Sequence, residues 1–321
     1  MKFRYLYILV CCSSFVFGQQ IPQFSQYSRN QYLINPAAAG VYDFTDISMV
    51  GRTQWTGFNN SPMSSIISIT TPALNSHKGG YYNPGVRTGS GNAHPEVGTG
   101  KMKHALGGQL IGDQYGAFRK VKANFTYAIH LPMTRKINFS FGANLGFSNN
   151  TFIKERAEVL DPTMDNSYTR FVSGSTNKSN LDLGVGLYLY SKQFYFGLAA
   201  DQLTKNMISF GSSEVNFNQK MYFNAIGGIR LKLTDDITLN PSFLVKYMNP
   251  APLSVDISVQ ADYQKFVWAG ISYRNSNALV GMVGVNLSKK FKLGYSFDMN
   301  VSRSNYIKKG SHEIVIGIML R

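Results

Sequence analysis

Strict alternation of apolar and polar residues constrains this chain more than any other feature of its sequence. In the segment 291–301, one face of an extended strand would carry only apolar side chains, namely Phe291, Leu293, Tyr295, Phe297, Met299 and Val301. The opposite face would carry Lys292, Gly294, Ser296, Asp298 and Asn300. The same period of two recurs in 253–264 and 137–148. These segments are predicted to be β-strands with one apolar and one polar face.

About fourteen segments of this kind follow one another along the chain. They are 47–56, 64–73, 104–112, 118–131, 136–148, 180–190, 193–203, 220–233, 237–248, 253–263, 266–274, 278–288, 291–301 and 310–321. Many are longer than the five or so residues usual in soluble sheets, and roughly ten tilted residues cross an outer membrane. The sequence therefore predicts an all-β fold, a transmembrane antiparallel outer-membrane β-barrel of about 14 strands.

The connections between these segments fall into two alternating classes. Those at 191–192, 234–236, 264–265 and 288–290 are short, whereas most of those at 149–179, 204–219, 249–252 and 302–309 are longer. Such asymmetry is typical of outer-membrane barrels, and with both termini in the periplasm the short turns are periplasmic. The long connection 74–103, rich in Gly, Pro and His, falls on the periplasmic side by the same count.

A soluble all-β fold, such as a large secreted sandwich or propeller adhesin, is the alternative for an alternating pattern. Strand length and aromatic residues near strand ends favour lipid. A hydrophobic content of 44% with a mean hydropathy of −0.14 fits alternation and excludes a helical membrane protein.

Residues 1–18 have the features of a signal peptide, with a basic start, a short apolar stretch and a cleavage site near Gly18/Gln19. Lipidation at Cys11 or Cys12 is the alternative. Since these are the only two cysteines, the mature chain would contain no disulfide. The chain is basic, with a formal net charge of +15, which suits acidic partners or outer-membrane lipid headgroups. Nucleic acid is not an expected partner, because the basic residues are dispersed and the chain is exported.

No motif for catalysis, metal binding or cofactor binding stands out. The five histidines lack metal-ligand spacing, and residues 98–101 (GTGK) lack the flanking residues of a phosphate loop. No spacing of Ser, His and Asp selects a catalytic set. We therefore predict that the protein is not an enzyme and that it has no catalytic, metal or cofactor residues. Gly184 and Gly186, inside a strand, indicate room for a neighbouring side chain in the lumen.

Residues 19–46 precede the barrel segment 47–321 and have no strand pattern. Asn35 before Pro36 suits a short helical turn that begins with an Asn cap and ends at Gly40. An ordered segment of this kind needs a surface to bury against. We interpret it as a plug or a partner-docking segment in or near the periplasmic mouth, with Pro22, Phe24, Tyr27, Asn35 and Pro36 as its candidate interaction residues.

The motifs of this segment and of the strands that follow occur in a characteristic order. They are PQFSQY at 22–27, LINPAAAG at 33–40, R-x-QW-x-G at 52–57, SP at 61–62, TP at 71–72, NPSFLVKY at 240–247, APL at 251–253, GISYR at 270–274 and GSHEI at 310–314. This order resembles the PorP/SprF family of Bacteroidota outer-membrane proteins, which are associated with type IX secretion and gliding motility. The resemblance covers nearly the whole mature chain. The 74–103 insertion and the final Arg321, where many barrels end in an aromatic residue, depart from the pattern.

The resemblance implies a non-enzymatic component of type IX secretion. Such a barrel would anchor periplasmic ring or cell-wall-binding lipoproteins, or hold secreted adhesins with C-terminal sorting domains at the surface. For Arg52, Gln54 and Trp55 we weigh a partner-binding role against a lumen hydrogen-bond pair plus an interfacial aromatic. A channel or porin-like transporter is the alternative function, and a plug formed by residues 20–47 would favour the scaffold.

Overall fold

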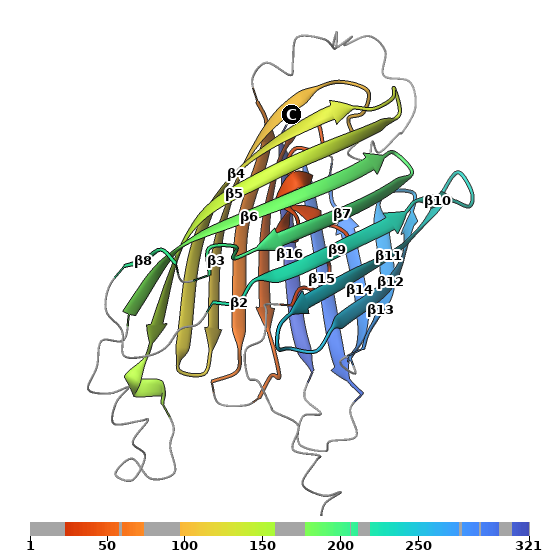
Figure 1. The fold of residues 1–321 in the computed structure, drawn as a ribbon. Helices are drawn as coiled ribbons and strands as arrows, with labels where there is room; N and C mark the ends of the chain where they lie inside the picture. Colours follow the sequence, from red (N-terminus) through yellow and green to blue (C-terminus); the bar gives the residue numbers. More distant parts are fainter. Residues whose placement is uncertain are drawn as a thin grey trace, which may run out of the picture.

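The fourteen predicted strands form a closed antiparallel barrel in a computed structural model of the chain (Figure 1). The structure describes residues 23–57, 60–73, 97–157, 177–205, 207–210, 219–275, 278–288, 290–301 and 310–320. Pro22, the predicted signal peptide and most of the 74–103 insertion lie outside these residues. Within the described part, no helix has the length and apolar character needed to cross a membrane.

The first half of the wall contains the longer strands. It comprises β1 (Thr45–Thr53), β2 (Met63–Pro72), β3 (Lys103–Tyr115), β4 (Phe118–Pro132), β5 (Ile137–Phe152), β6 (Asn177–Ser191) and β7 (Phe194–Asp201). The second half comprises β9 (Tyr222–Ile229), β11 (Ile237–Met248), β12 (Ser254–Tyr263), β13 (Val267–Arg274), β14 (Ala278–Asn286), β15 (Phe291–Asn300) and β16 (Ser311–Leu320). Two short pieces, β8 (Ser209–Phe210) and β10 (Leu231–Lys232), extend pairings of β6 and β11.

The barrel is closed by the pairing of its first and last strands. β1 runs antiparallel to β16 from Thr45 opposite Leu320 to Thr53 opposite His312. The wall continues around the ring until β9 pairs with both β7 and β11. Because every long strand has two neighbours, the backbone hydrogen-bonding groups of the wall need no partner from outside.

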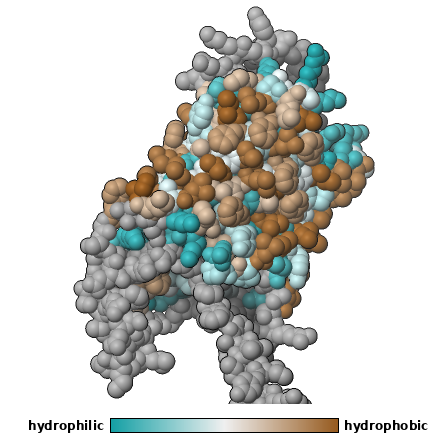
Figure 2. Space-filling view, in the orientation of Figure 1, coloured by the Kyte–Doolittle hydropathy of each residue, from teal (hydrophilic) through white to brown (hydrophobic). Residues whose placement is uncertain are grey.

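The predicted alternation of faces is confirmed. On β12, Ile257 and Val259 are 57% and 43% exposed on the outer surface, whereas Ser258 between them is 1% exposed on the inner one. Apolar side chains cover much of the outer wall in view in Figure 2. An exposed apolar surface of this extent is stable against lipid and not against water, so the outer wall is a transmembrane surface.

The two ends of the barrel differ as the sequence indicates. We call the end that holds the short β4–β5, β6–β7, β10–β11, β12–β13 and β14–β15 connections the turn end, and the opposite end the loop end. The connection from β2 to β3 starts and finishes at the turn end, as counted from the sequence. Both Thr45, where β1 begins, and Leu320, where β16 ends, also lie at the turn end.

Candidate functional site

Residues 23–44, which we call the plug, lie inside the barrel. They contain two single-turn 3-10 helices, η1 (Gln31–Leu33) and η2 (Pro36–Ala38), seen in red within the ring in Figure 1. Apolar residues on the outer side of the barrel are exposed, whereas the plug residues Tyr27 and Asn35 are each only 1% exposed. The plug therefore forms the main buried core of the molecule.

The Asn35–Pro36 pair forms the predicted cap of η2. Asn35 Oδ1 accepts a hydrogen bond from the amide of Ala37 at 2.9 Å, and proline fixes the next φ angle at a helical value. The remaining Asn35 amide donates from Nδ2 to the carbonyls of Leu187 at 2.9 Å and Leu198 at 3.1 Å. One side chain thus both starts a helical turn and binds two wall strands.

Glycines in the wall make room for η2. A Cβ added at Gly186 would lie 2.0 Å from Asn35 Oδ1, and one added at Gly142 would lie 2.5 Å from the amide nitrogen of Ala37. The predicted function of Gly186, room for a neighbouring side chain in the lumen, is confirmed. Any larger residue at either position would push η2 away from the wall.

A buried cluster of charges holds the start of the plug near the loop end. Arg52 of β1 forms ion pairs with Asp298 of β15 at 2.7 Å and with Glu313 of β16 at 3.2 Å. The carboxylate of Glu313 accepts hydrogen bonds from the backbone amides of Ser25 at 2.7 Å and Gln26 at 3.0 Å. The three charged side chains belong to the wall, and the plug adds neutral donors to the buried Glu313 carboxylate.

Two further strands complete this cluster. Arg274 of β13 pairs with Asp256 of β12 at 2.5 Å and with Asp298 at 3.1 Å. The hydroxyl of Ser25 donates to Asp298 at 2.8 Å and accepts from Arg52 at 3.0 Å. One network of ion pairs and hydrogen bonds therefore connects five wall strands, β1, β12, β13, β15 and β16, with the plug residues Ser25 and Gln26.

Aromatic side chains fill the middle of the lumen. Phe24 packs with Val50, Ile66 and Val315 of the wall, whereas Tyr27 belongs to a second apolar cluster with Ile34. Burial raises the pKa of the Tyr27 phenol above its ordinary value, and burial raises the pKa of Tyr32 to about 12. Both phenols therefore stay neutral at physiological pH.

The last residues of the plug are held at the turn end. Val97 forms a β-bridge with Tyr42, and the amide of Gly98 donates to the carbonyl of Val41 at 3.2 Å. Lys103 Nζ donates to the same carbonyl at 3.0 Å and to the Asp43 carboxylate at 2.9 Å. The plug thus spans the lumen from the charge cluster to the turn end, further than the mouth location expected from the sequence.

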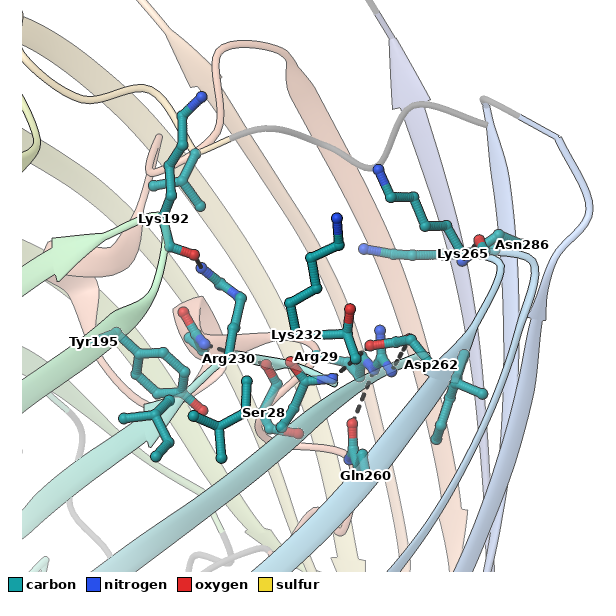
Figure 3. A pocket seen from close by; sticks show the side chains of 18 of the residues that line it. Ser28, Arg29, Lys192, Tyr195, Arg230, Lys232, Gln260, Asp262, Lys265 and Asn286 are labelled. Atoms are coloured by element: carbon teal, nitrogen blue, oxygen red, sulfur yellow. Dashed lines mark hydrogen bonds and ion pairs between the residues drawn. The ribbon is translucent and has the colours of Figure 1, made fainter. Parts of the chain in front are cut away.

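A cavity of about 1120 Å³ lies beside the plug at the turn end. The plug lines it with Gln26, Ser28 and Arg29, and the wall adds residues from the ends of β7, β9, β11, β12, β13 and β15. Figure 3 shows Lys192, Lys232 and Lys265 extending above Arg29 and Gln260. Six cationic side chains line the cavity, namely Arg29, Lys192, Arg230, Lys232, Lys265 and Lys292, against the carboxylates of Asp235, Asp236 and Asp262.

Of the candidate residues, the structure brings together those of the plug. Phe24, Tyr27, Asn35 and Pro36 are buried in the lumen, and Arg52 reaches the plug through the charge cluster. Gln54 and Trp55 lie apart from it, after β1 at the loop end. The backbone amide of Gln54 donates to the Pro62 carbonyl at 2.8 Å. The Trp55 and Tyr115 rings pack edge-to-face, with their centroids 6.3 Å apart.

Sequence reasoning did not single out the other charged members of the cluster around Arg52. Asp256, Arg274, Asp298 and Glu313 all lie on inward faces near the loop end of their strands. Their position could have been inferred from the strand pattern. A charged residue on the polar face of an alternating strand must point into the lumen, because the other face contacts lipid. No group of His, Cys, Asp and Glu that could hold a metal ion occurs among the residues described by the structure.

Comparisons with known proteins agree with this architecture. The family described as "Type IX secretion system membrane protein PorP/SprF" matches residues 16–318. No curated protein matches the chain.

Among solved structures, the toluene transporter TbuX of Ralstonia pickettii is similar over 90% of this chain and 92% of its own, with 12% identity and a TM-score of 0.50. A deletion mutant of the monoaromatic hydrocarbon channel TodX is similar over 91% of this chain and 94% of its own, with 9% identity and a TM-score of 0.50. At these identities the likeness concerns the barrel fold alone.

Proposed function

Because this chain belongs to the PorP/SprF family of type IX secretion system membrane proteins, we propose that it is a non-enzymatic outer-membrane scaffold of that system. In this proposal the barrel anchors periplasmic ring or cell-wall-binding lipoproteins, or holds secreted adhesins at the cell surface. The turn end, where β1 begins and β16 ends, faces the periplasm.

The observation that carries the proposal is the plug. A diffusion channel needs a continuous aqueous path, whereas the lumen here contains Tyr27, Asn35 and Ala37 at 1%, 1% and 0% exposure. The plug is held at both ends: near the loop end the backbone amide of Ser25 donates to the Glu313 carboxylate at 2.7 Å, and at the turn end Asp43 pairs with Lys103 at 2.9 Å. A fixed plug suits a barrel that presents a rigid surface to partners more than one that conducts solutes.

Planar-bilayer recording separates the scaffold from the channel alternative. We expect the purified parent to conduct ions poorly and a variant that lacks residues 23–40 to conduct well. Steady, large conductance by the parent would support the porin-like function instead.

A test in cells addresses the scaffold itself. We expect deletion of the gene to reduce the surface display of secreted adhesins, and the parent protein to restore it. The double variant Phe24→Ala, Tyr27→Ala should reach the outer membrane, because all fourteen long strands remain, but should restore display poorly. Normal secretion and display in the deletion strain would contradict the proposed function.

A further inference from the structure

The charges around the turn-end cavity are unbalanced. Asp262 is neutralised by Arg29 at 2.6 Å and Asp235 by Lys232 at 2.6 Å, and Lys292 pairs with Asp46 at 3.0 Å. Within the residues that the structure describes, Arg230 and Lys265 have no carboxylate at ion-pair distance. Arg230 donates only to the backbone carbonyls of Ser191 and Lys192, at 3.4 and 3.0 Å. These carbonyls carry no net charge, so the cavity keeps its positive potential.

The plug side of the cavity offers hydrogen-bond donors without partners. Gln26 is 3% exposed, and neither its Nε2 nor the Ser28 hydroxyl has a hydrogen-bond partner among the described residues. Both residues line the cavity. Since an unpaired buried amide is costly, a ligand with acceptor oxygens would be favoured at this point.

The lining of the cavity also includes aromatic rings. The Arg29 guanidinium lies 4.5 Å from the centroid of the Trp268 ring, and its Nε donates to Gln260 Oε1 at 2.9 Å. Tyr195 adds further aromatic surface to the cavity. Cations, amide donors and aromatic faces together match a peptide that has carboxylates as well as backbone carbonyls and apolar side chains.

We propose that the turn-end cavity binds an acidic peptide segment of a periplasmic partner. This rests on the proposed scaffold function and specifies the chemistry of its docking site. Carboxylates of the peptide pair with Arg230 and Lys265, and a peptide carbonyl accepts from Gln26. The volume of the cavity, about 1120 Å³, exceeds that of most small-molecule sites and suits several extended residues.

The chain's own 74–96 connection, which enters and leaves at the same end, is a poor occupant. Its sequence carries Lys78 and Arg87 against Glu96, so its charge has the same sign as that of the cavity. Residues 158–176 are net acidic in sequence, but they connect β5 to β6 at the loop end. Charge complementarity therefore points to a segment of another molecule.

Intrinsic fluorescence can test this in the full-length mature barrel. The chain has two tryptophans, and only Trp268 lines the cavity. In a Trp55→Phe background, a synthetic decapeptide of alternating Glu and Ala should change Trp268 emission in a saturable manner. The same peptide with Lys in place of Glu should not, and higher salt should weaken the binding.

Matched variants assign the binding to the cavity. The double variant Arg230→Gln, Lys265→Gln should raise the dissociation constant of the acidic peptide about tenfold. The control Arg135→Gln, Lys136→Gln removes the same two charges from the exposed β4–β5 turn at the same end, and it should bind like the parent. Retention of heat-modifiable migration on gels verifies that each variant is folded.

Two results would overturn the proposal. One is equal peptide binding by the cavity variant and the parent; the other is complete displacement of the peptide by an equal concentration of inorganic phosphate, which would indicate a general anion site. Neither result would bear on the scaffold function, because adhesin display in the deletion strain tests that separately.

Discussion

The effect of a substitution on the stability of this protein depends on the side of the wall on which the residue lies. Val259 and Ser258 are neighbours in β12, yet one faces the outer surface and the other faces the plug. Arg at Val259 should destabilise the inserted barrel by about 2 to 4 kcal/mol, because it places a charge near the middle of the lipid-facing wall. Folding titrations into lipid vesicles measure this difference.

Ser258→Arg should fail in a different way. Since Ser258 is 1% exposed on the inner face of the wall, a long side chain there must displace neighbouring residues in the lumen, and conductance in planar bilayers should rise while insertion continues. Equal loss of insertion in both variants would contradict the assignment of their faces.

Arg52 is a buried charge of the wall, 4% exposed, so its removal should be costly. Arg52→Met leaves the Glu313 carboxylate without its guanidinium partner and leaves Asp298 paired with Arg274 alone, and it should cost about 3 to 5 kcal/mol. Lys292→Met is a matched control, because the Lys292–Asp46 pair is more exposed, with side-chain exposures of 20% and 11%. The control should cost less than Arg52→Met. Denaturant titrations in the same detergent measure the free energy of unfolding of both variants. An equal decrease in the two variants would contradict a role for burial.

At the scale of the element, the plug should respond to alkaline pH. The pKa of Tyr32 is raised to about 12 by burial, against about 10 for an unfolded tyrosine. The neutral phenol is therefore favoured in the folded state, and its contribution to stability is complete below about pH 10 and is lost as the pH rises toward 12. We expect the plug to loosen in that window, with increased conductance. The Tyr32→Phe variant should lack this rise in conductance at alkaline pH. If its conductance depends on pH as that of the parent does, Tyr32 is not the source.

The insertion between β2 and β3 divides into two parts with different roles. Deletion of 76–94 should leave the barrel folded, since loop length has a small effect on stability. Deletion of 76–100 also removes the Val97 and Gly98 contacts with the plug, so it should lower resistance to protease at residues 41–44. Limited proteolysis followed by mass spectrometry compares the two deletions, and similar cleavage in both would show that Val97 does not hold the plug.

Element by element, the strands could be read from the sequence but the contacts of the plug could not. Alternation is local, so 291–301 or 253–263 reveals its two faces without knowledge of any other strand. The Asn35 cap is local too. The Arg52–Glu313 pair joins residues that are distant in sequence, and it depends on which strand closes the ring and in what register. The cavity depends likewise on where the plug lies, which no periodicity encodes.

For the whole molecule, ring closure predicts unusual resistance to detergent. Each long strand has hydrogen-bonded neighbours on both sides. The unheated protein should therefore migrate faster on gels than the boiled protein, as a compact barrel does. Identical migration before and after boiling would mean that the ring is not stable in detergent.

The charge cluster at the β1–β16 seam also has a consequence for the order of biogenesis. Ser25 and Arg52 come before or in the first strand of the barrel, but their partners Asp298 and Glu313 lie in its last two strands, β15 and β16. A chain without these two strands lacks the carboxylates that bind Ser25 and Gln26, however well its early hairpins have formed. The loop-end contacts of the plug therefore form only after β15 and β16 have joined the barrel.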